Sequence, residues 1–304
     1  LNRLAEEGIR FTDAHSGSGV CTPTRYGILT GRYSWRSPLK RGVLGGYDAP
    51  LIEKDRPTVA GSLRQTGYKT AAVGKWHLGW NWTTRTEVKH TSDWGGKNID
   101  VDYTQPISHG PLAVGFDYYF GIPSSLDIIP YVYIENNEIT AAPDRVREAS
   151  PFPSFWRAGP TGSDFMHEDV LDTLTSKATA FIRDHVSESN DQPFFLYFSL
   201  TAPHQPWLPS EQFSGKSGAG MYGDFVLQVE WSVGEIMRTV EELGISENTM
   251  IIFTSDNGSR WQEHQIAEFD HLANGPFSGG KSDVWEGGHR VPFFIHWPKG
   301  GLIG

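Results

Sequence analysis

The chain has 304 residues, of which 38% are hydrophobic, and its 36 acidic and 26 basic residues give a net charge of −10. This charge balance argues against a nucleic-acid-binding protein, and no apolar run approaches the roughly 20 residues that a membrane helix needs. Without low-complexity segments, the composition predicts one large folded core rather than disorder. An anionic ligand would require a local basic cluster on an otherwise acidic surface.

Helices and strands are expected to alternate along the chain. In chain order, we expect helices over residues 1–7, 23–30 and 58–66, a strand over 70–73, a helix with its apolar stripe over 170–182, a strand over 194–200, a helix over 225–243, and strands over 249–254 and 291–297. This alternation predicts an α/β fold with a mostly parallel sheet and helices on both faces. Residues 38–57 and 81–111 are polar, glycine-rich connections, and loops of that length are usually functional.

Both ends of the chain read as truncated. The first residue is Leu1 rather than methionine, the opening pattern is that of a helix already under way and stopped by Gly8, and the last residues follow a strand with nothing to close the fold. We therefore expect residues 1–304 to form one partial domain.

Polar side chains follow three of the predicted strands at the point where each strand ends. These side chains are Lys75 and His77 after the first strand, His204 after the second, and Asp256 and Asn257 after the third. Ligands of open α/β sheets bind beyond the carboxyl ends of the strands. We therefore expect these segments to converge on one crevice.

Cys21 is the only cysteine, so the chain has no internal disulfide. It precedes Pro23, which suits the first turn of a helix, and a helix N-terminus stabilises negative charge. One interpretation is an inert buried cysteine, and a second is a thiolate activated by the helix end and Arg25. The spacing Cys-x-Pro-x-Arg, followed by Leu-Thr-Gly-Arg over residues 29–32, points to a third.

Residues 21–32, CTPTRYGILTGR, resemble the first signature of the type I sulfatases, and residues 67–77, GYKTAAVGKWH, resemble the second. Shorter matches at residues 203–204, 255–258, 280–281 and 286–288 extend the resemblance over the whole chain, and it is closest to bacterial sulfatases of sulfated polysaccharides. The resemblance implies an alkaline-phosphatase-like α/β fold that lacks its first strand and its C-terminal subdomain. It also implies a periplasmic or secreted sulfuric ester hydrolase acting on a sulfated carbohydrate or aryl sulfate.

In this family the cysteine is oxidised to formylglycine, so the resemblance implies this modification at Cys21 and a formylglycine-generating enzyme as a maturation partner. It also implies one Ca²⁺ held by Asp256, Asn257 and the modified Cys21, and an oxygen-only pair suits a hard cation. Arg25 would hold the formylglycine, and Lys75 would bridge it to the sulfate.

His77 would take a proton from the formylglycine hydrate, and we expect it to face the pocket with Lys75 because the segment is extended. His204 and Lys281 would grip the sulfate and assist the leaving oxygen. Taken singly, each residue also fits an ordinary role: a surface lysine, a satisfied histidine or a turn.

The chemistry of sulfate esters favours this arrangement independently. Anionic oxygens surround a weakly electrophilic sulfur, so attack needs positive groups and a nucleophile held in line. A hydrated aldehyde has two geminal hydroxyls. One attacks the sulfur and expels the alcohol, and the other loses its proton as the aldehyde re-forms and sulfate leaves. A plain serine or cysteine would stay sulfated.

Two departures from the family pattern stand out. Leu126 occupies the position where animal arylsulfatases have a histidine that contacts the site, and the family's paired aspartates are absent, with Asp13 no substitute for them. A phosphoester or phosphonate-ester hydrolase, an inactive fragment and a non-catalytic binder of sulfated glycans remain alternatives. Further candidates for the rim of the pocket are His15, His109, His167, His264 and His271. Trp35-Arg36 and the segment from Trp80 to Trp94 either read a sugar or pack in the core.

Overall fold

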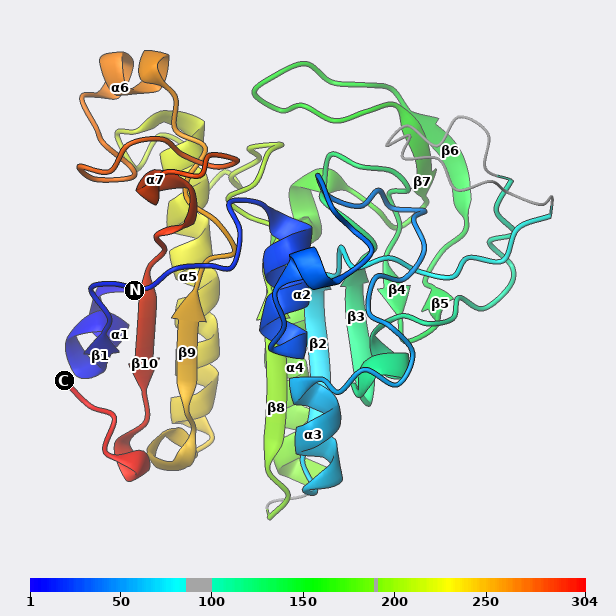
Figure 1. The fold of residues 1–304 in the computed structure, drawn as a ribbon, viewed down its shortest axis with the longest axis horizontal. Helices are drawn as coiled ribbons and strands as arrows, with labels where there is room; N and C mark the ends of the chain where they lie inside the picture. The colour runs from blue at the N-terminus through cyan, green and yellow to red at the C-terminus, as the bar shows by residue number, and fades with distance from the viewer. Residues whose placement is uncertain (86–99, 189–190) are drawn as a thin grey trace.

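The computed structural model describes residues 1–85, 100–188 and 191–304. Its strands form sheets of five, three and two strands, in the orders β5-β4-β3-β2-β8, β1-β10-β9 and β6-β7 (Figure 1). The strands are β1 (Ile9–Arg10), β2 (Lys69–Lys75), β3 (Tyr118–Ile122), β4 (Ile134–Glu135), β5 (Glu138–Ile139), β6 (Pro143–Arg147), β7 (Gly159–Gly162), β8 (Phe194–Ser199), β9 (Ile251–Thr254) and β10 (Phe293–His296). The α-helices are α1 (Asn2–Glu7), α2 (Cys21–Thr30), α3 (Val59–Gln65), α4 (Val170–Glu188), α5 (Gly220–Glu242), α6 (Glu263–Phe269) and α7 (Glu286–His289).

The strand directions correct the prediction of a mostly parallel sheet. β2 runs parallel to both β3 and β8, but β3, β4 and β5 are antiparallel neighbours, as are β9, β10 and β1. A two-residue turn joins β4 to β5, with Asn136 in the left-handed region at φ 57°, and so short a turn connects only antiparallel strands. The central sheet is therefore mixed.

Helices cover both faces of the five-stranded sheet. α2 and α3 lie in front of β2 in Figure 1, whereas α4 lies behind β2 and β8. α5 lies behind β9 of the three-stranded sheet. Successive residues of β2 accordingly enter different core clusters. Ala72 packs with Trp76, and Val73 packs with Leu174 of α4. Both faces of the strand are buried, as its unbroken apolar run predicts.

Most of the predicted elements are present, with shifted ends. α2 begins at Cys21 itself rather than at residue 23, and Gly31 ends it in the left-handed conformation, donating its N–H to the carbonyl of Gly27 at 2.8 Å. α1 ends before Gly8, which is extended at φ −120° rather than left-handed. The strands from β3 to β7 were not predicted.

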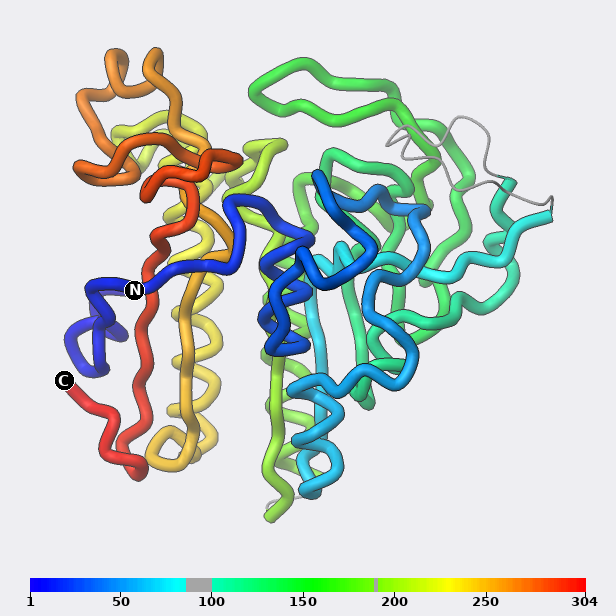
Figure 2. Tube along the Cα trace, in the orientation of Figure 1, coloured from blue at the N-terminus to red at the C-terminus, as the bar shows by residue number. Residues whose placement is uncertain are grey.

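The N-terminal and C-terminal residues lie near each other beside β10 (Figure 2). The backbone N–H of Gly304 donates to the carbonyl of Glu7 at 3.0 Å. Within the described ranges, no helix has the length and apolar character needed to cross a bilayer.

Candidate active site

Cys21 is the first residue of α2, and its side chain is buried. Its thiol lies 3.8 Å from Oδ1 of Asn257, and Nζ of Lys281 lies 3.7 Å from the sulfur. Asn257 follows β9 and Lys281 belongs to the segment before α7, so the fold brings together residues that are 236 and 260 positions from Cys21 in the chain. These predicted site residues therefore meet at one point.

Arg25 connects the two larger sheets one turn further along α2. Its Nε and Nη2 lie 3.0 and 2.9 Å from Oδ2 of Asp256, and its Nη1 donates to the carbonyl of Lys75 at 2.9 Å. Burial opposes the charge on both side chains, but their attraction prevails, so the pKa of Arg25 is raised and that of Asp256 is lowered. The pair is ionised, and it joins the end of β9 to the end of β2.

Lys75 is the last residue of β2, and its side chain is only 2% exposed. Burial lowers the pKa of its ammonium group; the charge of Arg25 adds to this effect and that of Asp256 opposes it. Ser199 at the end of β8 donates to the carbonyl of Lys75 at 2.8 Å. The ends of β2, β8 and β9 thus converge around Lys75, as the sequence predicts.

The backbone at His77 corrects one detail of the sequence argument. Its φ is 59°, so the segment after β2 turns into the left-handed region instead of staying extended. The Nε2–H donates to the carbonyl of Leu44 at 2.7 Å, whereas the buried Nδ1 has no partner among the described residues. Burial and the charges of Lys75 and Arg25 hold the pKa of His77 well below its usual range. The ring is therefore neutral, with a free lone pair on Nδ1.

His204 has a similar protonation state. Its Nδ1 donates to the carbonyl of Gln205 at 2.6 Å, which leaves Nε2 with the lone pair. The pKa of His204 lies well below its usual range, mainly because the ring is buried and secondly because of the charges of Lys281 and Lys75. Lys281, whose charge acts on His204, also contacts Cys21.

Asp127 and Arg157 are site neighbours that the sequence argument missed. Asp127 is buried, its Oδ1 lies 3.8 Å from Nδ1 of His204, and Arg157 donates to its Oδ2 at 2.8 Å. Leu126, which replaces the family's histidine, packs into the apolar core next to them. The departure at Leu126 was the sequence signal that could have directed attention to Asp127.

The other candidate histidines have different surroundings. His15 pairs with Glu286, and His167 is caged by aromatic rings, where burial and then Arg147 lower its pKa to about 3. The remaining three, His109, His264 and His271, are exposed. Within the described part of the chain, none of these five forms a hydrogen bond or an ion pair with the residues that surround Cys21.

The candidate tryptophans differ in their exposure to solvent. Trp80 and Trp82 are core residues, so this part of the candidate segment packs in the core. Trp94, at the end of the segment, lies outside the described residues. Trp35 is 60% exposed and stacks on Tyr33 with ring centroids 4.1 Å apart. Among the described tryptophans of this group, Trp35 is therefore the one available to a ligand.

The side chains of Asp256 and Asn257 offer the oxygen ligands that a hard cation prefers, but these two residues offer too few of them to bind the ion alone. Oδ2 of Asp256 is taken by Arg25, which leaves Oδ1, and Asn257 offers Oδ1 beside the Cys21 thiol. A calcium ion usually takes six to eight oxygen ligands. These two residues would hold one side of a Ca²⁺ ion and would need further oxygens to complete its shell.

Comparison with known proteins identifies the chain. The sulfatase family model matches residues 1–302. N-acetylgalactosamine-6-O-sulfatase of Bacteroides thetaiotaomicron is 33% identical, with 98% of this chain and 62% of the relative covered, and rat N-acetylgalactosamine-6-sulfatase is 32% identical, with 98% and 52% covered. A solved Bacteroides thetaiotaomicron sulfatase, from work on the metabolism of multiple glycosaminoglycans, has a TM-score of 0.81 at 32% identity over 98% of this chain and 66% of that one.

The chain thus spans between about half and two thirds of the length of these relatives. The structural likeness confirms the expected alkaline-phosphatase-like sulfatase fold, with the central sheet mixed. The family match covers nearly every residue, and the two signatures meet where Arg25 donates to the carbonyl of Lys75 and Thr22 to that of His77. The chain belongs to the sulfatase family.

Proposed function

We propose that residues 1–304 form the larger part of a catalytic domain that hydrolyses sulfate esters of a carbohydrate. The observation that carries this proposal is the concentration of positive charge at Cys21. Arg25, Lys75 and Lys281 surround this position, and Asp256 is the carboxylate among them. Arg25 and Lys75 are buried and Lys281 is half-buried. Cations withdrawn from water around one nucleophile suit an anionic ester, whose charge they neutralise more strongly than in water.

We infer that Cys21 is converted to formylglycine by a formylglycine-generating enzyme. The sulfur then marks the place of the modified side chain, 3.7 Å from the Lys281 ammonium. When hydrated, a formylglycine supplies one hydroxyl for attack on sulfur and a second whose deprotonation releases the sulfate. Arg25, one turn along α2 and fixed by Asp256, would hold this side chain in place.

The protein's own side chains divide the remaining work. Lys75 and Lys281 would neutralise the sulfate oxygens as charge develops on them. The neutral Nδ1 of His77 would accept the proton of the second hydroxyl. His204 would act at the leaving oxygen through Nε2, because its Nδ1 is held by the carbonyl of Gln205. The buried ion pair and hydrogen bonds described above preorganise these groups.

Asp256 and Asn257 would hold one Ca²⁺ beside position 21. Bound there, the cation would add positive charge next to the sulfate. The oxygen chemistry of the two side chains supports Ca²⁺ rather than Zn²⁺, which prefers nitrogen and sulfur ligands.

Peptide mass spectrometry of active full-length protein tests the nucleophile. We expect the peptide that contains position 21 to carry formylglycine, and Cys21→Ala to abolish turnover while the protein stays folded, since a small residue at a helix N-terminus costs little packing. An unmodified thiol in fully active enzyme would overturn this mechanism. Comparing the sulfate and phosphate esters of one phenol as substrates separates a sulfatase from a phosphoesterase.

We propose a periplasmic or secreted enzyme whose substrate is a sulfated carbohydrate. The similarity to sulfatases of N-acetylgalactosamine 6-sulfate suggests 6-O-sulfated galactosamine units as the first compounds to test. Asp127 and Arg157 lie beside His204, where hydroxyl groups of a sugar leaving group would find hydrogen-bonding partners. A screen of oligosaccharides sulfated at different positions decides this, and equal rates for every position would contradict it.

We further propose that another strand completes the sheet between β8 and β9. Among the described strands, β8 pairs only with β2, and β9 pairs only with β10, although Arg25 links the ends of β2 and β9. Ile252 of β9 is 53% exposed. An open, apolar strand edge is a template for further pairing. Carboxylates at the end of such a strand would supply the oxygens that Asp256 and Asn257 lack.

The test compares residues 1–304 with a longer form that carries the native upstream residues. Two additional carboxylates at a partly buried cation should strengthen calcium binding roughly a thousandfold or more, and the longer form should turn over sulfate esters faster. Calorimetry measures the affinity, and sulfate release measures the rate. Equal affinity and equal rate in the two forms would show that the proposed strand is dispensable.

A further inference from the structure

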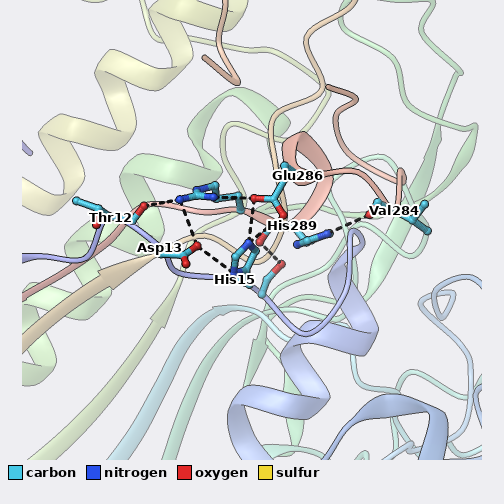
Figure 3. Close-up of polar contacts among 8 residues, drawn as sticks. Thr12, Asp13, His15, Val284, Glu286 and His289 are labelled. Carbon is cyan, nitrogen blue, oxygen red and sulfur yellow. Dashed lines mark hydrogen bonds and ion pairs between the residues drawn. The ribbon is translucent and has the colours of Figure 1, made fainter. Parts of the chain in front are cut away.

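A second polar cluster lies outside the site around Cys21. It consists of His15, Glu286 and His289, and one ligand atom from each of the three lies within 4.8 Å of the other two (Figure 3). His15 belongs to the segment between β1 and α2 that leads to Cys21, and it forms an isolated bridge with Arg290. The other two residues are the first and last of α7, which follows Lys281. The cluster therefore joins the two chain segments that carry Cys21 and Lys281.

The spacing of the polar atoms suits a small metal ion. Nε2 of His15 lies 3.1 Å from Oε2 and 3.3 Å from Oε1 of Glu286. Two ligands of a tetrahedral zinc ion with bonds of about 2.0–2.1 Å lie roughly 3.3 Å apart. The rings of His15 and His289 face the same space, with their centroids 5.1 Å apart. Small side-chain rotations would bring all three ligand atoms around one ion.

A hydrogen bond orients the ring of His289, and a carboxylate lies behind the ring of His15. A carbonyl only accepts, so Nε2 of His289, 3.1 Å from the carbonyl of Val284, carries the proton and leaves Nδ1 with the lone pair (Figure 3). On the far side of the His15 ring, Nδ1 lies 3.7 Å from Oδ1 of Asp13, while Nε2 faces Glu286. Metal-binding histidines commonly have this second partner, a carbonyl or a carboxylate, on the nitrogen that does not bind the metal.

We propose that His15, Glu286 and His289 bind a transition-metal ion of the zinc type, with water as its fourth ligand. Two imidazoles and one carboxylate form a donor set that suits Zn²⁺, whereas Ca²⁺ takes oxygen ligands. The cluster is partly exposed, so an ion reaches it directly from solution. It is chemically distinct from the oxygen pair of Asp256 and Asn257, and it does not depend on the function proposed above.

An ion-pair network around Arg290 is the competing explanation for why these side chains lie together. Its guanidinium lies 2.8 Å from Glu286 and 3.2 Å from Asp13, so an ordinary ion-pair network holds the two carboxylates without a metal. Two carboxylates against one guanidinium still leave a local formal charge of −1. The network also gives His289 no part, because its described polar contact is with the carbonyl of Val284. His289 therefore distinguishes the two explanations.

A bound ion would fasten segments that the backbone already holds together. Ser16 N donates to the carbonyl of His289 at 2.8 Å, Val291 N to that of Ala14 at 3.0 Å, and Ser282 N to that of Gly19 at 2.8 Å. These bonds place Lys281 against the chain that precedes Cys21. Because the ion binds the folded cluster, its binding should raise the thermal stability of the protein.

Calorimetric titration with ZnCl₂ in excess Ca²⁺ tests the site. The protein carries Cys21→Ser throughout, so that the thiol cannot take up zinc. We expect one bound equivalent, a Tm that rises by several degrees, and affinities at least tenfold weaker in His15→Ala and in His289→Ala. The matched control is His264→Ala, which removes an exposed histidine from α6 and should bind zinc as the parent does.

The conservative variant His289→Gln distinguishes loss of a metal ligand from loss of the fold, and circular dichroism checks the fold of each protein. We expect His289→Gln to keep the fold and to lose the zinc-dependent rise in Tm. Absence of zinc binding in the parent, or equal zinc affinity in the parent, His289→Gln and His289→Ala, would overturn the proposal. Co²⁺ in place of Zn²⁺ supplies a spectroscopic check, because intense visible bands are expected from tetrahedral nitrogen and oxygen coordination and not from a hydrated ion.

Discussion

The protein has two polar clusters, one around Cys21 and one around His15, and they differ in burial. Around Cys21, Arg25 and Asp256 form an ion pair with side chains 7% and 19% exposed. Around His15, Arg290 and Glu286 form a similar pair with side chains 25% and 44% exposed. An arginine and a carboxylate thus occur in both clusters, in different surroundings.

Burial decides what each cluster is able to bind. In the buried cluster, desolvation and neighbouring lysines hold the pKa values of His77 and His204 low, so both rings stay neutral. The charges of Arg25 and Lys75 are buried there, where they attract an anion more strongly than in water. In the exposed cluster, His15 lies between the carboxylates of Asp13 and Glu286, and Nε2 of His289 is bonded to the carbonyl of Val284, so carboxylate and imidazole donors together suit a metal cation. Substitutions in the two clusters should therefore differ in size and in kind.

The largest effect is expected from breaking the buried pair. Arg25→Ala leaves the Asp256 carboxylate buried without its partner and removes the hydrogen bond to the carbonyl of Lys75, so it should lower the free energy of unfolding by about 3–5 kcal/mol. Urea denaturation measures this loss. Arg25→Lys, which keeps the charge but not the two-pronged geometry, should lose less. A loss below 1 kcal/mol for Arg25→Ala would show that the pair is solvated.

The next effect concerns the catalytic rate. If Lys75, Lys281 and His204 stabilise the transition state, replacing any one of them with Ala should lower kcat by roughly a hundredfold or more. Steady-state kinetics on the full-length protein separate kcat from KM. Lys216→Ala removes an exposed lysine and serves as the control. Changes confined to KM for all three would mean that these side chains bind substrate without acting in the chemical step.

A third prediction concerns His167, a buried histidine outside both clusters. Burial holds the pKa of His167 at about 3, so the unfolded chain binds a proton below pH 6.5 that the folded chain does not take up. Stability is therefore lost as pH falls from 6.5 toward 3, by about 1.4 kcal/mol per pH unit, or about 2 kcal/mol at pH 5. His167→Phe should remove this part of the difference between pH 7 and pH 5. Urea denaturation at both pH values measures it, and an unchanged difference would contradict the buried neutral state.

The sequence predicted the parts of the fold that repeat a local pattern. β2 is a buried apolar run, β8 is a half-buried one, and α4 and α5 have regular apolar stripes, so each was predicted near its observed place. Strand direction is set by long-range pairing, which explains the error over the mostly parallel sheet. The short strands between β3 and β7 have too few residues for a periodic pattern to show.

The candidate site likewise contains residues that the sequence located and residues that it missed. Strand ends and two signatures located Cys21, Lys75 and Asp256, because residues at the carboxyl ends of strands converge whatever the loops do. Asp127 and Arg157 were missed because their pairing forms only in the folded chain. His15 and Glu286 are 271 positions apart, so no local pattern connects them.

The smallest effect is expected in the exposed cluster. Arg290→Ala removes a pair that water already screens, so Tm should fall by no more than about 2 °C, in contrast to Arg25→Ala. The same change removes a positive charge that contacts both Glu286 and Asp13, so zinc should bind several-fold more tightly if these side chains surround the ion. Thermal unfolding with and without ZnCl₂ measures both effects on one variant. Zinc binding that weakens in Arg290→Ala would show that Arg290 positions the cluster and does not compete for it, because its Nη2 also donates to the carbonyl of Thr12 at 2.7 Å.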